Sequence, residues 1–424
     1  MVPDMEEVEY TPAALAFPIE ESLVQVCRES FGVSLRAVVL TGSLARNEAS
    51  YSWKDGQAIL LSDVEAMVVL HDGSQLPSRH TTQSLCARAE QRLAAHGVRV
   101  HVSLSVVFAE YLRHLPPHIY SYELRACGLV LFGDLSLLEQ IPSYAASELS
   151  TEDAWRLLSN RLIEQMEPTV EFPVWSACGD ADGDTDGDAH GDAETLAGTV
   201  VRRYRSIKLC LDLATSLLLF VGHFDAGYRT RLRRLEEFAV TPGAQQLPIS
   251  IHEFLPLVRL CTAAKLQPET VELGPAFEER VTRWAWEVWL WQLQRMTGTD
   301  ASPNSAAEEM IRAFGRRQGG ERLIRGWLYA VRRTGWLQSA RYGPKWLSLF
   351  ASGLTPRHAV YMAAYRWQLS RPGHISSGAV RHIQHLQAVC DLLPVDKTAR
   401  AASAADVARQ LAWNYQEFVM ETRS

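Results

Sequence analysis

The stretch VVLTGSLARNEASYSWKDGQAILLSDVEAMVVL, residues 38–70, holds two polar features at the ends of apolar runs. One run leads into Gly42 and Ser43, and a second begins with two carboxylates, Asp63 and Glu65, at alternate positions. Alternate residues of a strand project from one face, so the two carboxylates should lie side by side. We therefore expect two strands whose ends build a common polar site.

The chemistry of these residues suits a nucleoside triphosphate and its metal. At a helix start, unpaired backbone N–H groups and the helix dipole favour an anion, and Arg46 adds a charge nearby. Mg²⁺ prefers carboxylate, phosphate and water oxygens. Either feature alone is more often a plain turn or a solvated strand start. Together they predict that Gly42, Ser43 and Arg46 bind phosphates and that Asp63 and Glu65 bind Mg²⁺ or Mn²⁺.

Periodicity divides the chain into a mixed first part and a helical remainder. Apolar runs at 35–42 and 64–70 and a clean alternation at 98–107 predict strands, with helices at 20–34 and 81–97. Farther along, strand patterns stop and helical patterns follow one another. We expect an α+β fold, in which an N-terminal domain with a central mixed sheet precedes a large all-helical region.

Two segments rich in turn-forming residues, IPSYAASELS and TGTDASPNSA, indicate where the chain divides. The predicted domains are a mixed domain over 1–145, a helical domain over 146–298 and a C-terminal helical domain over 299–424.

An acidic segment, GDADGDTDGDAHGDAE at 179–194, lies inside the second predicted domain. Read as a calcium-binding loop from Asp182, it has Ala193 at the twelfth position, where such a loop needs glutamate. We expect a disordered acidic loop, with weak calcium binding as the alternative.

Composition indicates an ordinary globular protein of the cytoplasm. The 424 residues are 47% apolar and 21% charged, with a net charge of −7. Seven cysteines without a Cys-x-x-Cys pair favour reduced thiols. The N-terminus, MVPDMEEVEY, is acidic where a signal peptide is basic and then apolar. The most apolar stretch, LCLDLATSLLLFVG, is too short to span a bilayer, so we expect no membrane association.

TGSLARNEAS followed by LSDVEAMVV resembles the signature of the DNA polymerase β-like nucleotidyltransferase superfamily. That signature is an apolar strand, Gly-Ser, and an Asp-x-Asp/Glu pair on the next strand. SDVEAMVV is most similar to the small-molecule branch, which includes aminoglycoside nucleotidyltransferases. ELRACGLVLFGD resembles the end of the family's catalytic domain, and YRSIKLCLDLATSLLLF resembles the helix that closes over the nucleotide. The specific resemblance covers roughly residues 35–135.

The resemblance implies a metal-dependent enzyme that moves a nucleoside monophosphate from a nucleoside triphosphate to an acceptor. The favoured acceptor is a hydroxyl of a small molecule or sugar. Ser43 would bind the β- and γ-phosphates, and Asp63 and Glu65 would be the catalytic metal ligands. Lys208, on the helix that closes the nucleotide cleft, would contact phosphate. The same chemistry on RNA or protein stays open, as do a nucleotide-binding pseudoenzyme and an interaction protein with a vestigial domain.

The sequence departs from the family pattern in two places. The spacing from Ser43 to Asp63 is long, so YSWKDGQAI should form an extra loop or hairpin. A third carboxylate usually projects from a later strand, but the polar face of 98–107 offers Ser103 and other non-acidic residues. Glu110, just past that strand, or an acid of the helical domain would have to complete the site.

Three helical features have both a functional and a structural interpretation. Lys208 and Arg205 either contact phosphate or form the wet face of an amphipathic helix. Trp284 and Trp291 share a helical face that should belong to the core. Residues 312–345 hold nine Lys or Arg, one acid and interleaved aromatics, which fits an anion-binding surface or a solvated face.

Overall fold

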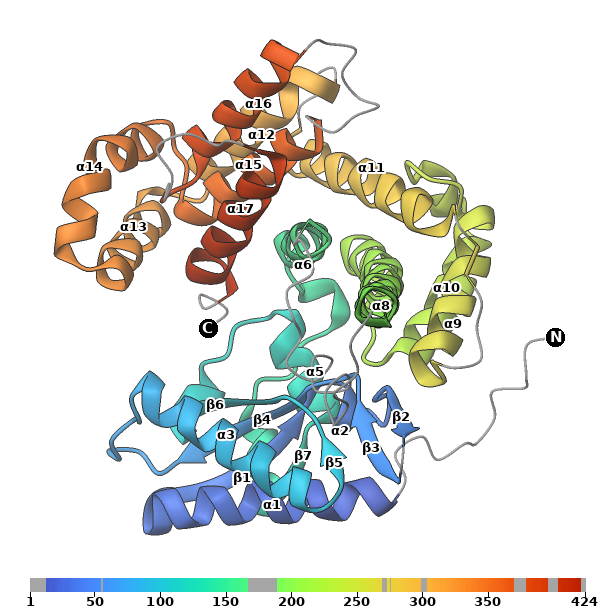
Figure 1. Cartoon of the computed structure of the whole chain (residues 1–424), viewed down its shortest axis with the longest axis vertical. Helices are drawn as coiled ribbons and strands as arrows, with labels where there is room; N and C mark the ends of the chain where they lie inside the picture. Colours follow the sequence, from blue (N-terminus) through green and yellow to red (C-terminus); the bar gives the residue numbers. More distant parts are fainter. Residues whose placement is uncertain are drawn as a thin grey trace. The chain divides into compact units, whose positions relative to one another are not determined.

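The computed structural model describes residues 13–54, 56–166, 189–268, 273–274, 276–298, 303–369, 379–395 and 403–420 (Figure 1). The fold is α+β, as expected: a small mixed sheet near the N-terminus is followed by many helices. Contacts group the chain into two compact units. The first lies within Met1–Ala154, Glu171–Val200 and Cys210–Phe277, and the second within Trp155–Val170, Val201–Leu209 and Glu278–Ser424.

Four strands form the main sheet of the first unit. Their order is β6 (Val102–Phe108), β4 (Val64–Leu70), β1 (Leu35–Thr41) and β7 (Leu129–Gly133). β1 runs antiparallel to β4 and β7, whereas β4 and β6 are parallel. β1 and β4 are buried along almost their whole length, which explains why the sequence shows continuous apolar runs there instead of alternation.

Helices cover both faces of the main sheet. α1 (Ala13–Phe31) and α3 (Arg79–Ala95) cover one face, where they share a core with Leu40, Val68 and Leu104. The other face belongs to a second core. That core is supplied by α4 (Ala109–Arg113), α5 (Ile119–Cys127) and the 3₁₀ helix η2 (Leu135–Gln140). Side chains of β4 alternate between the two cores, so the exposed Glu65 lies on the α5 side.

The long spacing before the acidic pair is filled by a hairpin, as predicted. β2 (Tyr51–Lys54) pairs antiparallel with β3 (Gln57–Leu60), and β3 pairs parallel with β5 (Val98–Arg99) in a second, three-stranded sheet. Gly56 in the turn has a φ of +76°, a conformation that favours glycine.

The prediction of a single strand at 98–107 is wrong, because the segment divides into β5 and β6. Glu90 of α3 explains the interruption: its carboxylate accepts the backbone N–H of Val102 at 2.8 Å and bonds to the His101 ring at 2.8 Å. The predicted alternation nevertheless holds, since Val98, Val100 and Val102 are buried and His101 is exposed.

Further helices complete the first unit. They are α8 (Ala189–Phe220) apart from Val201–Leu209, then α9 (Tyr228–Ala239) and α10 (Ile251–Leu266). Leu219 and Phe224 pack with Leu149 and Ala154 in a small core of their own. The acidic segment expected to be disordered is helical at its end, because α8 begins at Ala189; its residues 179–188 lie outside the described part.

The second unit is helical throughout its described part. Its helices include most of α6 (Thr151–Glu164) and α11 (Phe277–Thr297), then α12 (Pro303–Arg317), α13 (Gly320–Thr334), α14 (Trp336–Ala351), α15 (Pro356–Leu369), α16 (Ala379–Leu392) and α17 (Ala404–Phe418). Trp155 and Trp289 stand at the centre of its core, with ring centroids 5.5 Å apart. Trp284 is buried as predicted, but Trp291 is only partly buried, and the core face of α11 runs through Ala285 and Val288 instead. No helix in the described part is long and apolar enough to cross a membrane.

Candidate functional site

The Gly-Ser turn and the acidic pair meet at the end of the main sheet. Thr41 of β1 is the register partner of Glu65 of β4, and the Thr41 hydroxyl donates to the Glu65 carbonyl at 3.2 Å. Gly42 follows with a φ of +68°, and a Cβ atom there would lie 2.6 Å from Glu65 Oε2. The backbone conformation therefore favours glycine, and a side chain there would also displace the end of the Glu65 side chain.

The helix that begins at the Gly-Ser turn is short. α2 (Gly42–Ala45) is one turn long, and Asn47 then adopts the left-handed conformation with a φ of +55°. The Ser43 carbonyl accepts the Glu48 backbone N–H at 2.8 Å, which closes the loop on itself. The partly buried Ser43 stands at the start of α2, where backbone N–H groups lack helical partners.

Glu65 lies on β4, and Asp63 directly precedes that strand. Val64, between them, is fully buried in the core with α1 and α3, so Glu65 faces the opposite side, and the alternation of a strand predicts the same side for Asp63. Glu65 is exposed and Asp63 is partly exposed. Among the described residues, the Asp63 carboxylate has no hydrogen-bond or ion-pair partner. Its oxygens are therefore available to a ligand.

β6 places hydroxyls beside the acidic pair. Ser103 is the register partner of Glu65, and both are exposed, so the predicted facing of Ser103 is confirmed. Ser105, two residues on, hydrogen-bonds the phenol of Tyr120 on α5. Burial raises the pKa of Tyr120, the hydrogen bond to Ser105 opposes that shift, and the Glu65 carboxylate adds to it. Tyr120 thus belongs to the site, although nothing in its local sequence distinguishes it.

Glu110 does not complete the site, contrary to one of the sequence expectations. β4 and β6 pair in parallel from Glu65 with Ser103 to Leu70 with Phe108. Glu110 follows the far end of β6, about 16 Å or more from Ser103 at strand spacing. There its carboxylate pairs with Arg113 at 2.9 Å. Within the described residues, no group of three or more His, Cys, Asp and Glu side chains gathers as a metal site would need.

Arg46 is buried in an ionic network and does not extend freely into the site. Its guanidinium bonds to Glu123 at 2.9 Å and to Glu48 at 3.3 Å, and lies 5.6 Å from the centre of the Tyr228 ring. Burial alone would lower the pKa of Arg46, but the neighbouring carboxylates raise it by more. Arg46 therefore keeps its charge, which Glu48 and Glu123 already balance.

Lys208 belongs to the second unit, where its Nζ lies 5.0 Å from the centre of the Tyr204 ring. Its predicted contact with phosphate stays a prediction. Asp212 follows Lys208 by four residues, so helical spacing predicts that it shares a polar stripe with Lys208 and Arg205. That prediction is wrong at Asp212, which is buried.

Lys265 of α10 is a buried lysine that bonds to residues on both sides of the β2–β3 hairpin. Its Nζ donates to the hydroxyls of Ser50 and Ser62, each at 2.8 Å, and Ser62 in turn accepts the Ser50 backbone N–H at 3.0 Å. These contacts join the two ends of the β2–β3 hairpin directly before Asp63. No local sequence pattern indicates this role, because Lys265 lies 215 residues beyond Ser50.

Two tryptophans, one in the basic segment 312–345 and one directly after it, are not available for stacking. Trp327 and Trp346 are buried, and their indole N–H groups donate to the carbonyls of Leu354 and Pro394. Several basic side chains stay exposed, among them Arg316, Arg322, Arg332 and Arg341. An anion-binding surface here could thus use charge but not these two aromatic rings.

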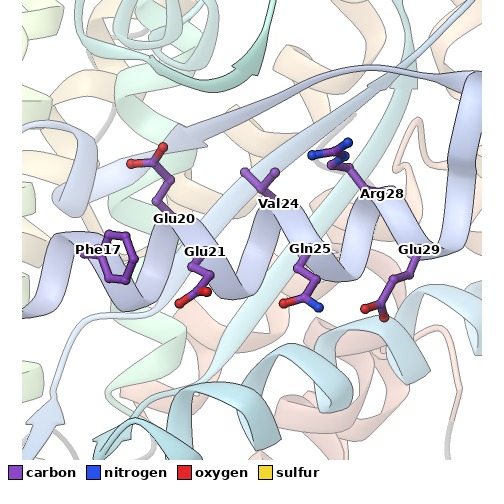
Figure 2. Close-up of a pocket in the computed structure, with 7 residues that line it drawn as sticks. All are labelled: Phe17, Glu20, Glu21, Val24, Gln25, Arg28 and Glu29. Carbon is purple, nitrogen blue, oxygen red and sulfur yellow. The ribbon is translucent and has the colours of Figure 1, made fainter.

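A surface hollow of about 500 Å³ follows the outer side of α1, away from the acidic pair (Figure 2). Figure 2 shows its lining side chains spread along both sides of the helix: Phe17, Glu20, Glu21, Val24, Gln25, Arg28 and Glu29. Glu29 is already paired with Arg88 and Arg92 of α3. The hollow is open and its charges are largely acidic, so it does not form a second candidate site.

Comparison of the chain with protein-family models, with curated proteins and with solved structures found no match. What the site can do is therefore argued from its own geometry. That geometry joins a glycine turn at the start of α2, the neighbouring carboxylates Asp63 and Glu65, and hydroxyls of β6 and α5.

Proposed function

We propose that this protein is a metal-dependent nucleotidyltransferase that binds a nucleoside triphosphate at the Gly42–Ser43 turn. The observation that carries the proposal is the approach of Glu65 to Gly42, where a Cβ atom would lie 2.6 Å from Glu65 Oε2. It brings a turn that would bind an anion and a carboxylate that would bind a cation to one point. A nucleoside triphosphate with its metal needs both within a few ångströms of each other.

The donor set fits Mg²⁺ or Mn²⁺. Two carboxylates, one of which has no partner among the described residues, would supply hard oxygen ligands, and triphosphate oxygens and water would supply the rest. When bound, such an ion neutralises charge on the phosphates and on the leaving pyrophosphate.

The chain's own residues would bind and orient the substrate. Backbone N–H groups at the start of α2 and the Ser43 hydroxyl would hold the terminal phosphates. Asp63 and Glu65 would fix the position of the triphosphate through the ion between them. Catalysis of this kind depends on positioning and on charge neutralisation rather than on a covalent intermediate.

We infer that the acceptor is a hydroxyl of a small molecule or sugar. Ser103, Ser105 and Tyr120 line the face beside Glu65, where their hydroxyls can exchange hydrogen bonds with a polyhydroxyl compound. An RNA or protein acceptor with the same chemistry remains a competing proposal.

One observation favours a second candidate, a protein that binds the nucleotide without transferring it. Ser103 stands beside Glu65 where a third carboxylate would be expected, and the described residues supply no replacement. Two carboxylates can hold one ion on a triphosphate, but they are less able to hold a second ion that activates the acceptor.

Nucleotide binding tests the proposal first. We expect ATP or another nucleoside triphosphate with Mg²⁺ to raise the melting temperature of the protein, and Asp63→Asn to abolish that increase, because it removes a charged ligand. Glu110→Gln is the matched control, since Glu110 is an exposed acid at the other end of β6. If ATP, GTP, CTP and UTP, each with Mg²⁺, raise the melting temperatures of wild type and Asp63→Asn equally, the proposal is wrong. It is also wrong if none of them raises the melting temperature of either protein.

A further inference from the structure

Four charged side chains beside the turn form a network that the proposed function does not use. The ionic network consists of Arg46, Glu48, Glu123 and Arg231, with two positive and two negative charges that balance each other. Arg46 bonds to both carboxylates, and Arg231 donates to the second oxygen of Glu123. Glu48 and Arg231 are 3% and 5% exposed, so these charges depend on one another rather than on water.

Glu48 caps a helix that begins 180 residues farther along the chain. α9 starts after Gly227, which has no side chain to cap it and has a φ of +86°. The Glu48 carboxylate accepts the backbone N–H of Tyr228 at 2.9 Å and that of Arg229 at 3.2 Å. A carboxylate at a helix N-terminus satisfies unpaired donors and interacts favourably with the helix dipole.

Arg231 extends the connection to α8. Its Nε donates to the Asp225 carbonyl at 2.8 Å, and its terminal nitrogen donates to the Thr215 hydroxyl at 3.2 Å. The network therefore joins the Gly42–Ser43 turn to α5, to the C-terminal part of α8 and to α9, and these parts all belong to the first unit. On the turn side, the Glu48 N–H holds the Ser43 carbonyl, so a shift of Glu48 moves Ser43 directly.

We propose that Arg46 and Glu48 are positioning residues, which fix the phosphate-binding turn by fastening it to α9 and do not contact phosphate themselves. The inference rests on the proposed function and reassigns the sequence-based role of Arg46. It follows that nucleotide binding at the turn and ordering of the α9 N-terminus are coupled, and such coupling acts in both directions.

The affinity for Mg²⁺-ATP, or for whichever triphosphate binds wild type best, separates positioning from direct contact. We compare wild type, Arg46→Met, Glu123→Gln and the double variant by calorimetry at a temperature where all are folded. Positioning predicts that each single variant binds about tenfold more weakly and that the double variant is no weaker than the worse single one. Direct contact predicts instead that Glu123→Gln, which removes one of the two carboxylates bonded to Arg46, binds as well as wild type or better.

Hydrogen exchange gives an independent readout at α9. In wild type, the bound nucleotide should slow exchange of the Tyr228 and Arg229 amides, and in Glu48→Gln it should not. Arg234→Met, which removes an exposed arginine of α9 outside the network, is the matched control and should behave as wild type.

The possible results are distinguishable. If the network variants lower only the melting temperature and leave nucleotide affinity unchanged, the network is merely structural and this inference fails alone. The same holds if nucleotide binds wild type without slowing exchange at α9. If wild type binds no nucleoside triphosphate, the proposed function fails and the inference fails with it.

Discussion

Gly42 is the residue on which the candidate site depends most. Its left-handed backbone directs the chain from β1 into α2, and its missing side chain leaves the space that the Glu65 carboxylate occupies. The glycine was identifiable in the sequence as part of a turn. Its contact with Glu65 was not, because that contact requires the antiparallel register of β1 and β4.

Replacing Gly42 should affect both the folding free energy and nucleotide binding, and a control glycine shows which effect is specific to the site. An alanine at Gly42 costs roughly 1–2 kcal/mol of folding free energy through its backbone conformation, and it also displaces the end of the flexible Glu65 side chain. Gly222→Ala is the matched control: its φ is +79°, and no described atom lies within 4 Å of the added Cβ.

We expect similar losses of stability in urea denaturation for the two variants, but loss of Mg²⁺-ATP binding only in Gly42→Ala. Equal binding by both variants would show that the position of the Glu65 carboxylate against the turn is unimportant.

At the scale of elements, β6 decides how much chemistry the site can perform. The alternation of its sequence was sufficient to predict that Ser103 faces the acidic pair, because a one-residue slip would expose its aliphatic side chains. Its length and its end were not predictable. Glu90, supplied by α3, sets where β6 begins, and the parallel pairing with β4 carries Glu110 away from the site.

Ser103→Asp should add the carboxylate that this strand lacks. Because Ser103 is exposed and adjacent to Glu65, an aspartate can be accommodated without burying a charge. We expect stronger dependence of nucleotide binding on Mg²⁺ concentration, or faster release of pyrophosphate once a suitable hydroxyl acceptor is present. Ser105→Asp, which disrupts the bond to Tyr120, is the comparison and should not reproduce the gain. An unchanged Mg²⁺ dependence in Ser103→Asp would place the metal elsewhere.

For the whole molecule, sequence patterns were sufficient to predict the α+β class and the two strands of the site. They did not predict which distant segments of the chain pack together. The predicted limits at 145 and 298 follow turn-forming residues, whereas the two compact units alternate along the chain. The ionic network and Lys265 show why: Glu48 meets Tyr228, and Lys265 meets Ser50, across 180 and 215 residues. Local periodicity carries no information about such pairs.

In the second unit, a buried histidine should make stability depend on pH. Burial, and then the charge of Arg156, lowers the pKa of His358 from 6.5 to about 3. Between pH 6.5 and pH 3, only the unfolded chain takes up the proton. The contribution of His358 to the free energy of unfolding is therefore complete above pH 6.5 and decreases as the pH falls toward 3.

We expect wild type to lose about 2–3 kcal/mol more than His358→Phe between pH 7 and pH 4.5. The phenylalanine keeps a ring beside Trp155 and Phe314 but cannot titrate. Chemical denaturation at both pH values measures the difference, with the exposed His80→Gln as control. Parallel losses in wild type and His358→Phe would mean that His358 does not titrate as described.

The central claim is that Asp63 and Glu65 hold a metal ion whose triphosphate lies at the Gly42–Ser43 turn. Crystals grown with Mn²⁺ and a non-hydrolysable ATP analogue test it most directly, because anomalous scattering locates Mn²⁺ independently of any assumption about the site. We expect an anomalous peak coordinated by both carboxylates and by the triphosphate, with the terminal phosphates at the backbone of Gly42 and Ser43. A nucleotide bound elsewhere, or an Mn²⁺ peak that contacts neither Asp63 nor Glu65, would contradict it.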